Sequence, residues 1–199
     1  MPQGSILGPL FFLIFFNNLL FSIDCDVDSY ADDTTLTVTD KSTEKIGTKT
    51  TESCEQVSQW MKANKLQLNA GKTHLLIAGT GSRLKLTHSK PPVYMEGIQL
   101  KEDPEGFETL LGCKVDADLK WHTQIGELIK KLKKRLTGIT QLKYAIPFKL
   151  RKSIAEGLFN SVLIYCLPVF GGCEQYELES LQVMQNKAVR IVTHSSFQN

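Results

Sequence analysis

The sequence lacks the residue patterns that mark disulfide-rich and zinc-binding proteins. Its 199 residues contain five cysteines, an odd number without CxxC spacing, and four histidines that lie far apart. This cysteine usage argues against a disulfide framework and for reduced thiols in an intracellular protein, cytoplasmic or nuclear. The scattered histidines suggest no zinc site. With 42% hydrophobic and 22% charged residues, the composition is that of an ordinary globular protein.

The sequence also lacks an uninterrupted hydrophobic run long enough to cross a membrane. The apolar stretch LFFLIFFNNLLFSI (10–23) follows Gly8–Pro9 and is broken by Asn17–Asn18. No positive charge precedes it and no convincing small-residue cleavage site is present, although a secretory signal needs both. We therefore expect a helix over 9–22 that is buried on most sides of a globular fold, in a protein that is neither membrane-bound nor secreted.

Acidic residues are almost absent from one long segment. Residues 119–155 contain ten Lys or Arg and one acid, Glu127. Residues 1–70 carry a net charge of −4, whereas residues 71–199 carry +6. A block this lopsided is typical of a surface that binds a polyanion. The alternative is a helix face that is simply solvated.

The apolar spacing predicts an α+β chain with a change of character near its middle. In the first part it predicts a hairpin of strands 26–30 and 34–39, a helix over 43–64, a buried strand over 73–79, and short strands up to about 115. From Trp121 the spacing becomes helical to Leu142, and further helices are predicted at 149–163 and 178–193, separated by LPVFGG. We treat Trp60 and Trp121 as core residues. The chain thus divides into a mixed part, 1–116, and an all-helical part, 117–199.

Two adjacent aspartates, Asp32 and Asp33, stand at the tip of the predicted hairpin in VDSYADDTTLTV (27–38). Two carboxylates about 4 Å apart repel by about 4 kcal/mol at an effective dielectric constant of about 20, so the pair needs full solvation or a cation between them. A tight turn can aim both carboxylates at one Mg²⁺, and paired metal ions are the usual clamp for phosphoryl transfer. Ordinary turn chemistry is the alternative. NAGKT (69–73) ends like a phosphate-binding loop, but Leu66 stands where its first glycine belongs, which excludes that site.

Four motifs in a fixed order resemble those of reverse transcriptases from non-LTR retrotransposons of the jockey-like group. PQGSILGPLFFLIFFNNL (2–19) resembles motif B, YADD (30–33) motif C, WMKANKLQLNAGKTHLLIAG (60–79) motif D, and FETLLGCKVDADLKWHTQI (107–125) motif E with the entry to the thumb. The tail LESLQVMQNKAVRIV (178–192) is similar to the helix that follows the thumb. The resemblance implies a partial right-hand polymerase palm at 1–116, an antiparallel sheet with helices on one face, followed by a helical thumb and connection at 117–199.

The resemblance also implies roles for individual residues. Asp32 and Asp33 would be the catalytic ligands of Mg²⁺ or Mn²⁺, and Lys72 would be a catalytic lysine near the leaving pyrophosphate. The other residues would contact the nucleotide, the primer or the template: Gln3, Gly4, Ser5 and Tyr30 at the nucleotide and template, Leu111 and Gly112 in the primer grip, and Lys130, Lys131, Lys133, Lys134 and Arg135 along the nucleic-acid backbone.

The activity implied is RNA-directed DNA synthesis, with an RNA template, a DNA primer and deoxynucleotides as partners. The family needs a third aspartate from motif A, upstream of motif B, and this sequence begins with Met1 just before PQGS. We therefore expect motif A and the fingers to be missing, metal binding to be weakened, and the chain to be inactive by itself. The alternative function is a non-catalytic remnant that binds RNA or DNA through the basic thumb helices.

Overall fold

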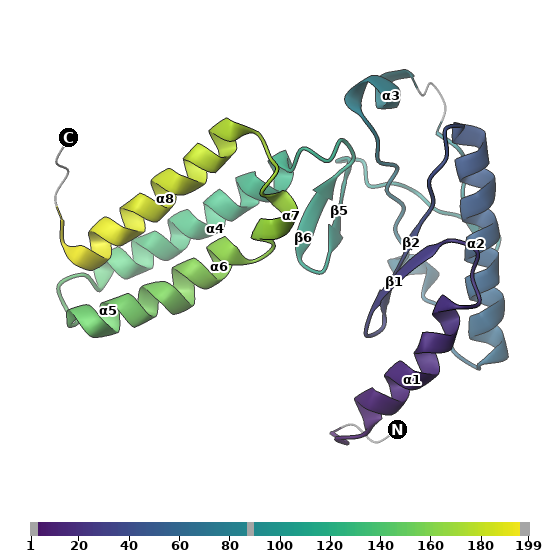
Figure 1. Ribbon diagram of the computed structural model, residues 1–199, viewed down its shortest axis with the longest axis horizontal. Helices are drawn as coiled ribbons and strands as arrows, with labels where there is room; N and C mark the ends of the chain where they lie inside the picture. Colours follow the sequence, from purple (N-terminus) through teal and green to yellow (C-terminus); the bar gives the residue numbers. More distant parts are fainter. Residues whose placement is uncertain (1–3, 87–89, 196–199) are drawn as a thin grey trace. The chain divides into compact units, whose positions relative to one another are not determined.

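The computed structural model describes residues 4–86 and 90–195, which form helices and short antiparallel strands (Figure 1). The chain forms two compact units. The first joins Met1–Leu75 with Lys85–Glu102, and the second joins Leu76–Leu84 with Asp103–Asn199. This division differs from the expected boundary at residue 116, because the strands just before that residue belong to the same unit as the C-terminal helices.

Within residues 4–86 and 90–195 the strands form three separate two-stranded antiparallel hairpins, whereas the resemblance implied one palm sheet. The pairs are β1 (Asp26–Tyr30) with β2 (Asp33–Thr37), β3 (Tyr94–Met95) with β4 (Ile98–Gln99), and β5 (Phe107–Leu110) with β6 (Cys113–Asp116). The predicted hairpin around Asp32 and the predicted short strands are confirmed. The predicted buried strand over 73–79 is wrong. There only Leu75 makes an isolated bridge, to Glu102, and the side chains are half-buried or exposed.

The first unit packs two helices against the β3–β4 hairpin. These helices are α1 (Gly8–Leu20) and α2 (Thr43–Ala63). The buried core residues are Phe16, Leu19, Ile23, Cys54, Val57, Val93, Met95 and Leu100. Trp60 packs on this core as predicted, edge-on to Phe16 with 5.8 Å between ring centres. Gly47 lets α2 approach the loop before β3, because a Cβ at this position would lie 2.5 Å from the Cβ of Pro91.

Helix α1 is less buried than the sequence predicted. Of its residues only Phe16 and Leu19 are buried, whereas the side chains of Leu10 and Ile14 are 52% and 64% exposed. The prediction failed because the core of the first unit covers only one side of α1, although the sequence of this helix is apolar on all sides. None of the described helices combines the length and apolarity that crossing a bilayer requires.

The second unit is a bundle in which long helices lie side by side (Figure 1). Its helices are α4 (His122–Gln141), α5 (Phe148–Ala155), α6 (Ser161–Ile164), α7 (Leu167–Phe170) and α8 (Gln175–Thr193). A further short helix outside the bundle, α3 (Gly81–Leu86), precedes the β3–β4 hairpin. The bundle core comprises Ile125, Leu128, Leu132, Leu136, Ile139, Ala155, Phe159, Phe170, Leu181, Met184, Ala188 and Val192, and Trp121 packs against it as predicted.

The predicted helices of this unit are confirmed with three differences. A π turn, Glu156–Asn160, joins α5 to α6 within the predicted helix 149–163. The last helix begins at Gln175, three residues earlier than predicted. The predicted break LPVFGG contains the short helix α7, which follows a corner at Cys166 with φ of +59°.

The β5–β6 hairpin is attached to the start of α4. The backbone N–H of Lys114 donates to Gln124 Oε1 at 2.9 Å, and the N–H of Thr123 donates to Asp116 Oδ2 at 3.2 Å. Trp121, the residue before α4, has φ of +69° and makes no side-chain cap bond. Asp116 therefore acts as the cap for one of the free N–H groups at the start of this helix.

Candidate active site and nucleic-acid interface

The two predicted metal-binding aspartates lie at the tip of the β1–β2 hairpin (Figure 1). Tyr30 pairs with Asp33, so Ala31 and Asp32 form a two-residue turn. Ala31 has φ of +55°, and its carbonyl accepts a hydrogen bond from the Ser29 hydroxyl at 3.3 Å. Asp32 and Asp33 are exposed, and neither forms a salt bridge with a residue that the structure describes. The tip therefore presents both carboxylates to solvent.

The strand register anchors this tip and gives the hairpin an acidic face. Val27 and Leu36 lie opposite each other and pack against the unit-1 core. Because side chains alternate along a strand, Asp28, Tyr30 and Asp33 share the other face, where they are exposed. Sequence reasoning did not group Asp28 with the tip, although the period of two along β1 could have done so. The hairpin is thus held by one face and directs negative charge outward on the other.

The donor atoms at the tip suit a divalent metal ion, but the described residues do not complete a site. Carboxylate oxygens are the ligands that Mg²⁺ takes in proteins. Within residues 4–86 and 90–195, no group of three or more His, Cys, Asp or Glu is arranged to hold a metal ion. Asp32 and Asp33 therefore offer two exposed carboxylates at the tip.

The other predicted residues of the nucleotide site lie in the same compact unit. Lys72 ends the short 3₁₀ helix Ala70–Lys72, and its side chain is exposed. Gly4 and Ser5 are exposed in the segment before α1, and Gly4 has φ of +87°. Gln3 lies outside the described residues. The structure records no hydrogen bond or ion pair between the described members of this set and the tip aspartates.

The two predicted primer-grip residues form the turn of the β5–β6 hairpin. Leu110 pairs with Cys113, and between them Leu111 and Gly112 have φ of +48° and +79°. Two successive left-handed residues are the backbone of a type I′ turn, which suits the twist of the flanking strands. The hydroxyl of Tyr165 donates to the carbonyl of Leu111. The turn is therefore fixed to the joint between α6 and α7 by a residue that sequence reasoning missed, because 54 positions separate the partners.

The predicted backbone-binding residues lie on α4 but are not equivalent. Lys131, Lys133 and Lys134 are exposed and form no salt bridge with a described residue. Lys130 is exposed and pairs with Glu127 at 2.9 Å, a bond that lowers the pKa of the glutamate. Arg135 is half-buried, and its guanidinium donates to the carbonyl of Leu158 in the π turn at 2.6 Å. Lys131, Lys133 and Lys134 are thus available to a ligand, whereas Lys130 pairs with Glu127 and Arg135 binds the bundle.

A second polar cluster, not predicted from sequence, joins the start of α4 to the start of α8. His122 Nδ1 lies 2.8 Å from Glu177 Oε1 and 3.3 Å from the Tyr176 hydroxyl. The Glu177 side chain is only 8% exposed, and its Oε2 has no hydrogen-bond partner among the described residues. The bond from Glu177 raises the pKa of His122. This cluster joins two helices of the bundle and contains none of the predicted site residues.

Comparison with known proteins identifies the family of the chain. The model of the family described as reverse transcriptase (RNA-dependent DNA polymerase) matches residues 1–115, which include both the β1–β2 tip and the β5–β6 turn. Because the match covers more than half of the chain, the chain belongs to this family. The prediction made from the ordered motifs is confirmed.

Two curated relatives come from Drosophila melanogaster. One is the probable RNA-directed DNA polymerase from transposon BS, 22% identical over 97% of this chain. The other is the RNA-directed DNA polymerase from mobile element jockey, also 22% identical over 97% of this chain. The chain spans 22% of the length of each relative. No solved structure matches.

Proposed function

We propose that this chain supplies part of the active site of an RNA-directed DNA polymerase encoded by a non-LTR retrotransposon. The observation that carries the proposal is the pair Asp32 and Asp33, exposed at the tip of a hairpin whose other face packs on the unit-1 core. The names of the two relatives support the same activity. The substrates of the proposed reaction are an RNA template, a DNA primer and deoxynucleotides.

In this proposal Asp32 and Asp33 hold Mg²⁺ or Mn²⁺, which when bound stabilises the charge that develops in phosphoryl transfer. Tyr30 supports the turn beside the primer end, and Lys72 lies near the leaving pyrophosphate. Gln3, Gly4 and Ser5 face the nucleotide and template. Leu111 and Gly112 contact the primer from a turn that Tyr165 holds in place.

We keep the palm at 1–116 and the thumb at 117–199 as the proposed regions of the polymerase. The last part of the proposed palm, residues 103–116, lies in the same compact unit as the proposed thumb helices, and its β5–β6 hairpin is hydrogen-bonded to α4. Because the tip offers only two carboxylates, we also propose that a further carboxylate from another segment of the polymerase completes the site. The 199 residues alone then bind the metal ion weakly and do not extend a primer.

The test is a primer-extension assay on an RNA template with deoxynucleotides and Mg²⁺ or Mn²⁺. The 199-residue chain is expected to give no product. A longer polymerase that also contains the motif A segment is expected to be active, and Asp32→Asn should lower its rate at least about 100-fold, since metal stabilisation of the transition state is worth several kcal/mol.

Asp26→Asn is the matched control, because it removes an exposed carboxylate from the same hairpin, at the far end of β1. Its rate should stay within about threefold of the parent polymerase, since exposed charges this far from the reacting atoms are largely screened. Equal losses in the two variants would contradict a specific role for Asp32. Template-dependent synthesis by the 199 residues alone would contradict the proposed need for a further carboxylate.

A second function, nucleic-acid binding without catalysis, is favoured by the exposed lysines of α4. Lys131, Lys133 and Lys134 lack salt-bridge partners among the described residues and suit phosphate contacts that are independent of sequence. A mobility-shift assay with RNA and with RNA–DNA duplex tests it. Binding should weaken steeply as the salt concentration rises, and the absence of any shift at low salt would exclude this function.

A further inference from the structure

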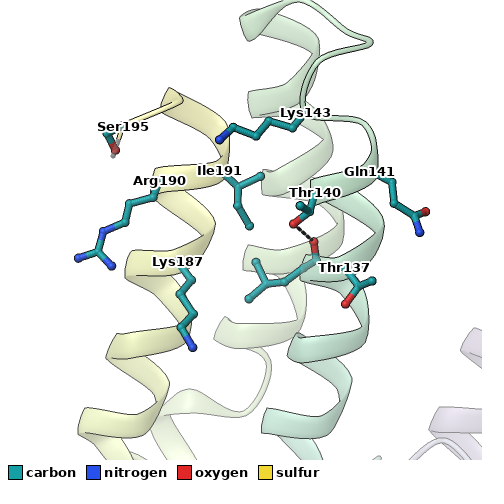
Figure 2. Close-up of a pocket in the computed structure, with 9 residues that line it drawn as sticks. Thr137, Thr140, Gln141, Lys143, Lys187, Arg190, Ile191 and Ser195 are labelled. Carbon is teal, nitrogen blue, oxygen red and sulfur yellow. Dashed lines mark hydrogen bonds between the residues drawn. The ribbon is translucent and has the colours of Figure 1, made fainter. Parts of the chain in front are cut away.

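A groove of about 550 Å³ lies between the C-terminal halves of α4 and α8 (Figure 2). Thr137 and Thr140 line it from α4, and Lys187 and Arg190 line it from α8. The Lys143 side chain reaches from the turn after α4 across one end of the groove toward α8 (Figure 2). None of the lining residues that the structure describes is acidic. The groove therefore carries three cations and no described acid, while the hydroxyls of Thr137 and Thr140 donate to carbonyls of α4.

The end of the bundle at this groove is positively charged although two helices end there. Helix C-termini carry negative partial charge, which would repel an anion. The buried guanidinium of Arg151 binds one carbonyl in the last turn of α8 and two in the loop after α4: its Nε donates to Val192 O at 2.8 Å, and its Nη1 donates to the carbonyls of Lys143 and Ile146. Desolvation and then the positive charges of Arg151 and Lys143 lower the pKa of His194. The local field thus favours a negatively charged ligand.

Between the cations the groove is apolar, and an aromatic ring lies beside one of them, since Lys143 Nζ is 5.4 Å from the centre of the Tyr144 ring. Leu136 of α4 and Ile191 of α8 line the groove. Tyr144, next to Lys143, is 84% exposed, and its ring centre lies 5.3 Å from that of His194. An exposed aromatic ring beside cations is the usual arrangement for stacking an unpaired base while the backbone follows the charges. A duplex hides its base faces, so these features favour a single strand.

The groove continues into the basic face of α4. Lys133 lies one helical turn before Thr137, whose hydroxyl donates to the Lys133 carbonyl at 3.1 Å. Residues four apart lie on the same side of a helix, so Lys133 extends the line of cations beyond the groove. A strand seated in the groove can therefore continue along α4.

We propose that this groove binds a single strand of nucleic acid, with its phosphates on Lys143 and Lys187 and one base against Tyr144. The inference goes beyond polymerase chemistry: it assigns a ligand to a surface that lies in the other compact unit from Asp32 and Asp33. It rests on the proposed nucleic-acid partner but not on catalytic activity.

The experiment measures fluorescence anisotropy of labelled oligo-dT and oligo-U of about 12 nucleotides with the full 199-residue chain, over a range of salt concentrations. The test variant is K143Q/K187Q, which leaves Arg190 in place. We expect it to weaken binding about tenfold near 0.1 M salt and to reduce the salt slope by about 1.4, at about 0.7 for each phosphate contact in a single strand. Tyr144→Leu should weaken binding about fivefold or more through lost stacking.

The matched control is K41Q/K45Q, which removes two exposed lysines of the first unit and should leave the affinity unchanged. Equal effects of the two double variants would overturn the proposal. A duplex that binds as tightly as the single strand, with no effect of Tyr144→Leu, would overturn the choice of a single strand. Displacement of the oligonucleotide by polyglutamate at equal charge would identify an acidic protein segment as the ligand and overturn it too.

The failure of this inference can be distinguished from failure of the proposed polymerase. Loss of polymerase activity in Asp32→Asn tests the hairpin tip alone, whereas oligonucleotide binding by K143Q/K187Q tests the groove alone. If polymerase activity depends on Asp32 while K143Q/K187Q binds like the parent chain, only the groove assignment fails. If K143Q/K187Q weakens binding while polymerase activity does not depend on Asp32, the groove assignment is supported and the polymerase proposal fails.

Discussion

Leu111 adopts a backbone conformation that leucine rarely takes, with φ of +48° in the β5–β6 turn. A Cβ in the left-handed region costs about 1–2 kcal/mol, and glycine or asparagine tolerates that region better. Its neighbour Gly112 meets the same requirement at no such cost. The Tyr165 hydroxyl and the pairing of Leu110 with Cys113 hold the strained residue in place. A turn that contacts a primer end can use this rigidity.

We expect Leu111→Asn to raise the free energy of unfolding of the second unit by about 1 kcal/mol, since asparagine followed by glycine is a preferred type I′ pair. The measurement is the midpoint of urea denaturation. Leu110→Asn is the control, because Leu110 has ordinary strand geometry and its replacement should give no gain. A loss of stability in Leu111→Asn would mean that contacts of the leucine side chain outweigh the relieved strain.

At the scale of elements, the start of α4 is joined to the start of α8 by His122 and Glu177. Glu177 is buried, and its bond raises the pKa of His122 above the ordinary histidine value of about 6.5. A group whose pKa is higher in the folded protein than in the unfolded chain stabilises the fold, and this stabilisation is fully present when the pH is below the unfolded pKa. That stability is lost as the pH rises through the folded value. His194 has a lowered pKa, so its contribution has the opposite sign: it is lost as the pH falls.

The melting temperature of the second unit should therefore fall as the pH is raised from the ordinary histidine pKa of about 6.5 through the higher pKa of His122 in the folded protein. His122→Gln should remove this fall, whereas His194→Gln should retain it. Thermal melts followed by circular dichroism across this range provide the measurement. An unchanged slope in His122→Gln would assign the pH dependence to another group.

The elements that sequence predicted well are those whose signals are local. The helical spacing of apolar residues in α4 and the alternation of residues around Asp32 are both visible within short segments of sequence. Helix α4 and the β1–β2 hairpin were therefore predicted correctly. The strand over 73–79 failed because apolar residues alone do not provide a partner strand, and only Leu75 finds a bridge. The supports of the site were also missed, since Tyr165 reaches the primer-grip turn from 54 positions away. The family motifs located the candidate site residues, but they did not reveal the long-range contacts that hold these residues in place.

At the scale of the whole molecule, helix α1 leaves a broad apolar surface uncovered. Leu10 and Ile14 lie one turn apart on the side away from the core residues Phe16 and Leu19. Exposed patches of this kind mark surfaces that contact other protein segments. The relatives are more than four times as long as this chain, and we propose that another part of the polymerase covers this side of α1.

The chain alone should therefore self-associate, and L10Q/I14Q should reduce this association without lowering the melting temperature. Sedimentation velocity measures the association, and a thermal melt measures the stability. Phe16→Gln is the control: it alters a buried residue of the same helix and should destabilise the first unit by about 3 kcal/mol or more. If L10Q/I14Q destabilises the fold as much as this control, α1 packs more completely in solution than proposed.

The π turn between α5 and α6 has a consequence for how sequences of this kind can differ in length. Such a turn is what an α-helix becomes when it takes in one extra residue. Loss of one residue between Glu156 and Asn160 would let the segment close into a regular helix with Phe159 or its replacement still facing inward. The same loss in α4 would rotate everything after it by about 100° and carry Leu132 and Leu136 out of the core. Natural one-residue deletions in the bundle should therefore be found in the π turn and be absent from α4.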